Sequence, residues 1–370
     1  MSEVTFLPWL GLEKRTEVAG VSFVPWQEFR ESPELPEEER RWLERYFSRY
    51  RELDGKTPVN TITIAQSDEG DRRRILRVVR ATAAAHLVYK HAVYLFRGNP
   101  TMAPPRGERW QVLTQRFDPS KDWVALSEGY TTVATTLDSF VEIAPMSAGE
   151  SVWQLKEPVV GMANALVNKA ENDEDLAVAL DLLVEGAKTS DAHVRRLNFV
   201  LLGTALEMLT GAGNQFHKGK WIADKLAEAV RKAREGCPAA ADELERAATS
   251  AHEVDPDLVW IWMAGCCDCH DRGACVRHKQ GYMGWYRRRN KVIHEGRAEG
   301  GLLLHQRPDN GESHRWPTLV EESQGAHACD VALAMSGWLL LDRVGEDLSC
   351  KDWSHWCHLL DNVVEAMGMG

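Results

Sequence analysis

The sequence has no apolar run approaching the roughly 20 residues that a membrane span requires, so we expect no membrane association. Its first five residues lack the basic-then-apolar profile of a signal peptide. The eight cysteines are not spread as a disulfide framework, which favours a reducing, cytoplasmic location. The chain also lacks an excess of positive charge, and its formal charge of −11 argues against a general DNA-coating protein.

Several catalytic motifs are missing as well. Gly219-Lys220 suggests a phosphate-binding loop, but Asn214 stands where the first glycine is required and Trp221 replaces the Ser or Thr. His294-Glu295 is not followed by the second histidine of a zinc-protease helix. There is no Gly-x-Ser-x-Gly elbow either. We therefore reject a phosphate-binding loop, a zinc-protease helix and a nucleophile elbow.

The length of 370 residues and a composition of 44% hydrophobic and 27% charged residues fit two globular domains. The best boundary is the small, polar stretch 144–150, which contains Pro and Gly. We predict an α+β fold: a mixed helix and strand domain of unknown role over 1–148, then an all-α domain over 149–370. No internal repeat is present.

Alternating and β-branched segments predict strands, and helical spacing of apolar residues predicts helices. In the first domain we expect strands over 21–24, 60–64, 110–113, 123–126, 130–136 and 140–143, and helices over 36–50 and 71–96. In the second we expect helices over 152–167, 173–187, 191–209, 220–234, 239–251, 257–264, 318–344 and 353–367. Asp191 is a plausible N-cap, and Gly211 a helix stop.

A basic island stands out in the second domain. Between 277 and 297 the only acidic residue is Glu295, and the basic residues are Arg277, Lys279, Arg287, Arg288, Arg289, Lys291 and Arg297. In an acidic chain this favours an anionic partner such as a phosphate, and the alternative is a solvated helix face. On a helix His294 shares a stripe with Asn290, whereas Arg289 lies about 140° away.

The segment 289–294, Arg-Asn-Lys-Val-Ile-His, resembles the Arg-x4-His signature of HEPN domains. Its residues are most similar to those of the ApeA-like branch. The segment 195–209 resembles the early helix of such domains and ends in Leu-Glu-x-Leu, and a second helix follows over 221–234. The resemblance covers roughly 190–345 and implies an all-α HEPN-like core. Arg287 or Arg288 can take the place of Arg289 as the signature arginine.

The resemblance implies metal-independent RNA cleavage without a cofactor, in anti-phage defence or as a toxin. RNA carries its own nucleophile in the 2′-OH. His294 can move a proton near neutral pH, Arg289 can stabilise charge on the phosphate, and Asn290 can orient His294 or hold a phosphate oxygen. The further residues expected to bind RNA are Arg287, Arg288 and Lys291.

Other interpretations of these residues remain open. His294 can be a satisfied core histidine at the end of its helix, and the protein then a non-catalytic HEPN module that binds RNA or nucleotide, or mediates assembly. Glu207 can face the site and tune the histidine, or take an ordinary exposed position, which we favour. Family members usually pair two signature helices across a two-fold axis, so we expect a homodimer, with the Trp- and Leu-rich segment 332–341 at its interface.

A dense group of possible metal ligands precedes the basic island. Cys267, Cys269, Cys275 and His278 can close a tetrahedral zinc site, although their spacing departs from paired two-residue knuckles. The alternative is a loop of free, reduced thiols, which we favour. A bound zinc would play a structural role: it would fix the loop that delivers the signature helix, or stabilise an interaction protein.

Overall fold

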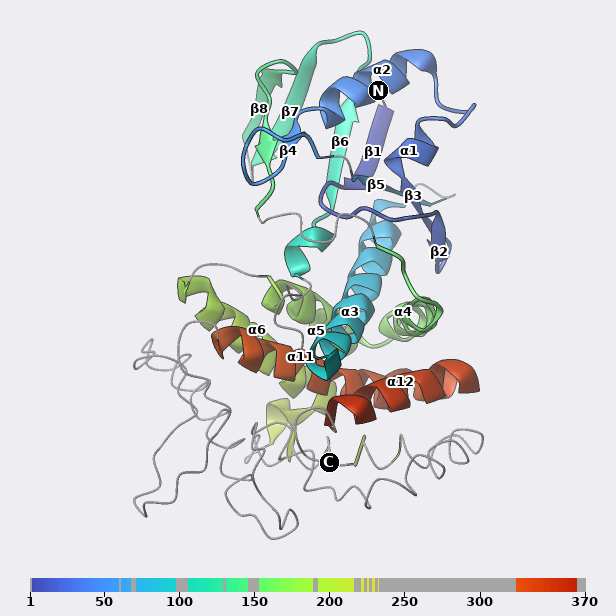
Figure 1. The fold of residues 1–370 in the computed structure, drawn as a ribbon, viewed down its shortest axis with the longest axis vertical. Coiled ribbons are helices and arrows are strands. Elements are labelled where there is room, and N and C mark those ends of the chain that lie inside the picture. Colours follow the sequence, from blue (N-terminus) through green and yellow to red (C-terminus); the bar gives the residue numbers. More distant parts are fainter. Residues whose placement is uncertain are drawn as a thin grey trace. The chain divides into compact units, whose positions relative to one another are not determined.

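A computed structural model describes residues 2–59, 61–67, 71–97, 106–128, 131–145, 153–188, 192–215 and 324–364, together with six helical positions between 221 and 232. The chain divides into two compact units, one of 1–80 and 108–156 and the other of 81–107 and 157–370 (Figure 1). The expected boundary at 148/149 stays a prediction. The α+β fold class is confirmed, with an antiparallel sheet and helices first and a helical region after them.

The first unit is built around a five-stranded antiparallel sheet with the strand order β2-β3-β5-β1-β6 (Figure 1). Its strands are β1 (Ser2–Leu7), β2 (Thr16–Val18), β3 (Val21–Pro25), β5 (Thr63–Ser67) and β6 (Leu113–Phe117). β1 is paired on both sides, because Phe6 faces Ile64 of β5 and Val4 faces Gln115 of β6. The last four residues of β1 are all buried, so both faces of this strand are covered.

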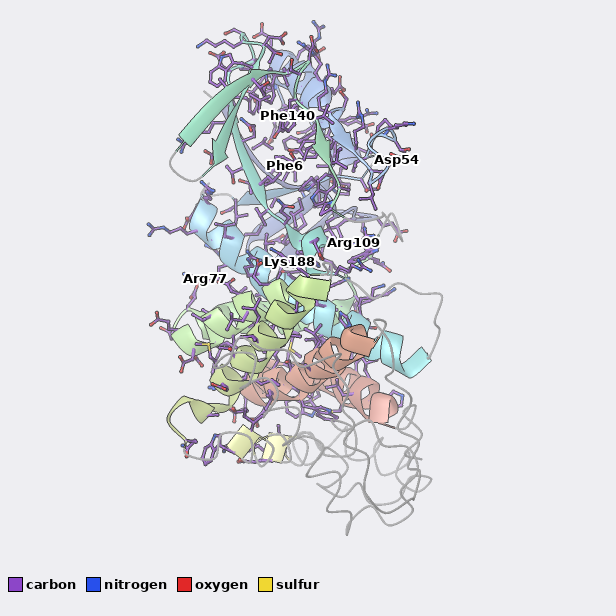
Figure 2. All side chains as sticks on the ribbon, turned by 90° about the vertical axis from the view of Figure 1, so that its left-hand side faces the viewer. Phe6, Asp54, Arg77, Arg109, Phe140 and Lys188 are labelled. Atoms are coloured by element: carbon purple, nitrogen blue, oxygen red, sulfur yellow. The ribbon has the colours of Figure 1, made fainter. Side chains whose placement is uncertain are left out.

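An aromatic core covers one face of this sheet. It includes Trp42, Tyr46 and Phe47 on one side of α2 (Glu37–Phe47), as the helical spacing predicted. Their rings pack against the sheet: the Phe6 and Phe47 centroids are 5.0 Å apart, and Trp42 stacks on Phe117 at 4.5 Å. Figure 2 labels Phe6 within this core. Each fully buried side chain of this size contributes about 1.5–3 kcal/mol to folding.

Smaller elements complete the first unit. They are α1 (Trp26–Phe29), the parallel pair β4 (Tyr50–Arg51) and β9 (Glu142–Ile143), the hairpin of β7 (Trp123–Glu128) and β8 (Thr131–Thr136), and the 3-10 turn η1 (Gly107–Trp110), which straddles the division between the units. The long helix α3 (Arg72–Arg97) begins in this unit and continues into the other. Its start is fixed by Arg74, whose guanidinium donates to the carbonyl of Ala19 at 3.1 Å.

The second unit is a bundle of helices (Figure 1). Besides the end of α3 it contains α4 (Glu157–Ala170), α5 (Glu174–Gly186), α6 (Ala192–Thr210), α11 (Gln324–Val344) and α12 (Cys350–Val364), with the short turns η2 (Ala212–Asn214) and η3 (Gly345–Asp347). α6 packs against both α5 and α11, and α12 packs against α4. Gly211 ends α6 with a φ of 66°, which confirms the predicted stop.

Three details of the sequence analysis need correction. The strand β1 was not predicted. The strand expected over 110–113 is wrong, because Trp110 closes a buried 3-10 turn and β6 starts at Leu113. The strand expected over 60–64 starts later, at Thr63.

The segment 332–341 was expected at a dimer interface, but its described side chains are buried inside the protomer. Trp338 is 1% exposed, and Leu340 is fully buried. These side chains are part of the bundle core, and the homodimer itself stays a prediction.

Candidate functional site

The predicted site residues Arg287, Arg288, Arg289, Asn290, Lys291 and His294 lie outside the described residues, as do Cys267, Cys269, Cys275 and His278. The structure therefore describes the helices before and after the signature segment. Within the described part of the chain, no group of three or more His, Cys, Asp or Glu side chains is arranged to hold a metal. Among those same residues, no helix has the length and apolarity to cross a bilayer.

The last helix with described bounds before the signature segment is α6, and none of its described side chains is exposed. Leu206 is fully buried, Leu209 is 4% exposed, and Glu207 between them is only 7% exposed. The favoured interpretation of Glu207 as an exposed residue is wrong: α6 packs against α5 and α11, and its partly exposed side carries Val200, Thr204 and Met208 instead. The alternative that Glu207 faces the site and tunes His294 stays a prediction.

The end of α6 is held by an arginine from the helix that follows the signature segment. Arg343 of α11 donates from Nη2 and Nε to the carbonyl of Leu209, at 2.8 and 3.1 Å. Its third nitrogen, Nη1, lies 3.3 Å from the carboxylate of Asp173, which also accepts from the backbone N–H of Leu176 at the start of α5. The Arg343 guanidinium lies at the C-terminus of α6, and the Asp173 carboxylate lies at the N-terminus of α5. Each charge is opposite in sign to the helix dipole at that end, so each stabilises its helix.

The described positions between 221 and 232 are helical, as predicted for the second helix. Trp221 donates from its indole nitrogen to the carbonyl of Thr210 at 2.8 Å, at the end of α6. Lys232 lies 3.1 Å from Asp342 of α11, and the hydrogen bond with this carboxylate raises the pKa of Lys232. These contacts attach the segment to α6 at one end and to α11 at the other.

A second group of ionisable side chains lies on α3 and α12. The Tyr89 hydroxyl and His355 Nε2 are 3.3 Å apart, and their rings stack at 5.8 Å. Burial, followed by the charge of His358, lowers the pKa of His355. This phenol–imidazole pair can share a proton, and the imidazole stays neutral to a lower pH than usual. The sequence analysis did not find it because the two residues are far apart in the chain.

The polar groups of the first unit serve the core. The hydroxyls of Tyr46 and Tyr50 are 2.8 Å apart inside the aromatic cluster, and burial raises the pKa of both phenols. Arg109 lies over the Trp153 ring at 4.9 Å and donates to the carbonyl of Trp9. These contacts satisfy buried polar atoms and join distant parts of the unit.

A set of arginines was also missed. The sequence analysis treated 71–96 as a helix and did not consider the charge of its first turns, where five of the nine residues 72–80 are arginine. A count of basic residues along each predicted helix would have found them.

No family model, no curated protein and no solved structure matches this chain. The HEPN resemblance therefore rests on the quoted residues alone.

Proposed function

We propose that this protein is a metal-independent endoribonuclease that cleaves RNA through attack of the 2′-OH, in anti-phage defence or as a toxin. The observation that carries the proposal is the set Arg289-Asn290…His294 within a basic island of an acidic chain. The helices on either side support it: α6 and α11 pack together, and the helical positions between 221 and 232 contact both. A HEPN-like core requires such a bundle around its signature helix.

The proposed residues suit each step of this reaction. His294 removes the proton from the 2′-OH, whose oxygen then attacks the adjacent phosphorus. The bond from phosphorus to the 5′-oxygen breaks, the leaving oxygen takes a proton, and a 2′,3′-cyclic phosphate remains. Arg289 stays charged at all working pH values and stabilises the extra negative charge of the phosphate in the transition state.

The test is cleavage of single-stranded RNA in EDTA by the purified protein. We expect 2′,3′-cyclic phosphate ends, and loss of activity in His294→Ala with little change in thermal unfolding. His358→Ala is the matched control, because this exposed histidine of α12 is not one of the proposed site residues. A need for Mg²⁺, or cleavage by His294→Ala, would refute the proposal. RNA binding without cleavage would favour the non-catalytic HEPN module.

We further propose that two chains share the site. Because Arg289 lies away from His294 on an ideal helix, a partner chain can supply the missing arginine. Mixing Arg289→Ala chains with His294→Ala chains should then restore part of the activity that each variant lacks alone. A monomer with full activity would contradict this arrangement.

A test for zinc at Cys267, Cys269 and Cys275 distinguishes the nuclease from the zinc-stabilised interaction protein. A structural zinc would appear as about one metal ion per chain, and Cys269→Ser would then destabilise the protein. A metal-free protein with unchanged stability would leave Cys267, Cys269 and Cys275 as reduced thiols, as we expect.

A further inference from the structure

Three of the four large apolar side chains that are exposed in the described part of the chain belong to neighbouring segments of the first unit. They are Leu53, which is 56% exposed, and Val141 and Ile143, which are each 50% exposed. The fourth is Val178 on α5 in the other unit. A single exposed apolar side chain is ordinary at a protein surface, whereas a group of them marks a contact surface. We call the three residues of the first unit the β9 patch.

The patch is formed by β9 and by the turn that follows β4. Around β9 the side chains alternate: Glu142 is half-buried, while Val141 and Ile143 on either side of it are exposed and share the opposite face. The turn reaches this face as well, because a Cβ built on Gly55 would lie 3.5 Å from Cδ1 of Ile143. Leu53 stands in this turn, which Gly55 closes by donating its N–H to the carbonyl three residues earlier, at 2.8 Å. The turn and β9 therefore present one apolar surface.

The strand β9 also has a free edge. It runs parallel to β4: the N–H of Glu142 donates to the carbonyl of Arg49 at 3.2 Å, and the N–H of Ala144 donates to β4 itself at 2.8 Å. Alternate residues of a strand direct their main-chain groups to opposite edges, so those of Val141 and Ile143 point away from β4. Among the residues that the structure describes, no hydrogen bond uses the main chain of Val141 or Ile143. Another strand can therefore pair with this edge.

The surroundings of the patch carry charges of both signs. The segments 49–56 and 138–143 contain three basic and four acidic residues, so they produce no strong field of one sign. Some of these charges are also used within the unit. Arg49 pairs with Asp138, and the carboxylate of Asp54, labelled in Figure 2, accepts from two backbone N–H groups of its own turn at 2.8 Å each. Nucleic acid binds to a positive surface, so the patch favours an apolar partner over RNA.

The size of the patch indicates what kind of partner fits. A stable contact between two folded proteins uses about 20–30 residues on each side, far more than three apolar side chains and one short strand edge. An extended peptide needs much less, because its main chain bonds to the free edge and its alternate side chains contact the exposed face. The patch therefore suits a single strand of a partner better than a second folded copy of this chain.

We propose that the β9 patch is the docking site for an extended peptide segment of a partner protein, which pairs with the free edge of β9 as an added strand. The segment carries aliphatic side chains at every second position, so that one face of it packs on Leu53, Val141 and Ile143. It has no proline at the paired positions, because proline lacks the N–H that strand pairing uses. This docking site shares no residue with the proposed nuclease site, so either proposal can fail alone.

The experiment uses phage-displayed random peptides of about 12 residues as the probe, since these are longer than most strands. The purified full chain selects binders, and fluorescence anisotropy then measures the affinity of synthetic copies. The test variant combines Val141→Thr with Ile143→Thr, because threonine keeps the branched Cβ and the strand preference but weakens the apolar contact. The matched control is Val178→Thr, which changes the exposed apolar residue of α5.

We expect the selected peptides to carry aliphatic residues at alternate positions and no central proline. They should bind the double variant at least about tenfold more weakly, because two apolar contacts are weakened together. Val178→Thr should bind them as the parent does. The affinity should change less than about twofold between roughly 50 and 200 mM salt, since the contact is apolar.

Methylation of the peptide's amide nitrogens tests the strand pairing itself. Alternate N–H groups of an extended peptide point to opposite edges. Methylating one alternate set should therefore abolish binding, and methylating the other set should leave it unchanged. This comparison needs only the parent protein, so it holds even where the double variant fails to fold.

Selected peptides that bind the double variant as tightly as the parent would overturn the proposal, and so would a library that yields no binder. Equal effects of the two methylated sets would show that no strand is added to β9. A parent that dimerises in light scattering, through a contact that the double variant loses, would identify a second copy of the chain as the occupant and would equally overturn the proposal of a peptide.

Discussion

The contact of Arg343 with the end of α6 gives a prediction whose size follows from the structure. Arg343→Met keeps most of the side-chain volume but removes two hydrogen bonds to the carbonyl of Leu209 and the ion pair with Asp173. A hydrogen bond to a charged group contributes about 1.5–3 kcal/mol when buried. Because the Arg343 side chain is 31% exposed, solvent weakens these contacts, and we expect a total loss of about 2 kcal/mol.

Hydrogen exchange measured by mass spectrometry reports this loss locally. A decrease of about 2 kcal/mol in the free energy of opening corresponds to roughly 30-fold faster exchange of the amides in the last turn of α6. Arg343→Lys should fall between the parent and Arg343→Met, because lysine keeps the charge and loses the planar fork. The control is Lys351→Met on α12, which breaks an ion pair with Glu157 whose partners are both 81% exposed and should change nothing measurable. Equal exchange rates in the parent and Arg343→Met would refute the reasoning.

Two further predictions concern the second unit. Gly345→Ala should lower the melting temperature clearly, because a Cβ at this position would fall inside the Trp353 ring, whereas Gly213→Ala meets no atom within 4 Å and should be nearly neutral. His355→Gln should flatten the dependence of stability on pH. The pKa of His355 is lowered in the folded state by burial and by His358, so the unfolded state binds the proton more readily. The parent should therefore keep its full stability above about pH 6.5 and lose part of it as the pH falls below that value, and urea unfolding at several pH values would detect the loss.

The elements that the sequence predicted well have one buried side and one exposed side. In α2 the aromatic residues recur at helical spacing opposite charged residues, and the structure buries that side. Gly211 stops α6 because its φ of 66° suits glycine better than other residues. Local sequence decides both features, so no knowledge of distant contacts was needed.

Elements that are covered on all sides were harder to predict. β1 has two neighbouring strands and both of its faces are buried, so Phe6 and Leu7 are equally hidden and the alternation that predicts a strand is weak. Glu207 was placed at the surface because a charged residue on a helix usually faces water. Its burial follows from the packing of α5 and α11 against α6, and α11 lies more than a hundred residues later in the chain.

The same packing explains why the candidate site can be tested without unfolding its surroundings. α6 ends before the signature segment and α11 follows it, yet Arg343 of α11 binds the last carbonyl groups of α6. The interval 216–323 therefore begins and ends on helices that already contact one another. The described contacts that join α6, α11 and the helical positions between 221 and 232 are made by Arg343, Trp221 and Lys232, and none of them involves His294. Replacing His294 should consequently change RNA cleavage far more than thermal unfolding, and a variant that lost both would indicate a core histidine in place of a catalytic one.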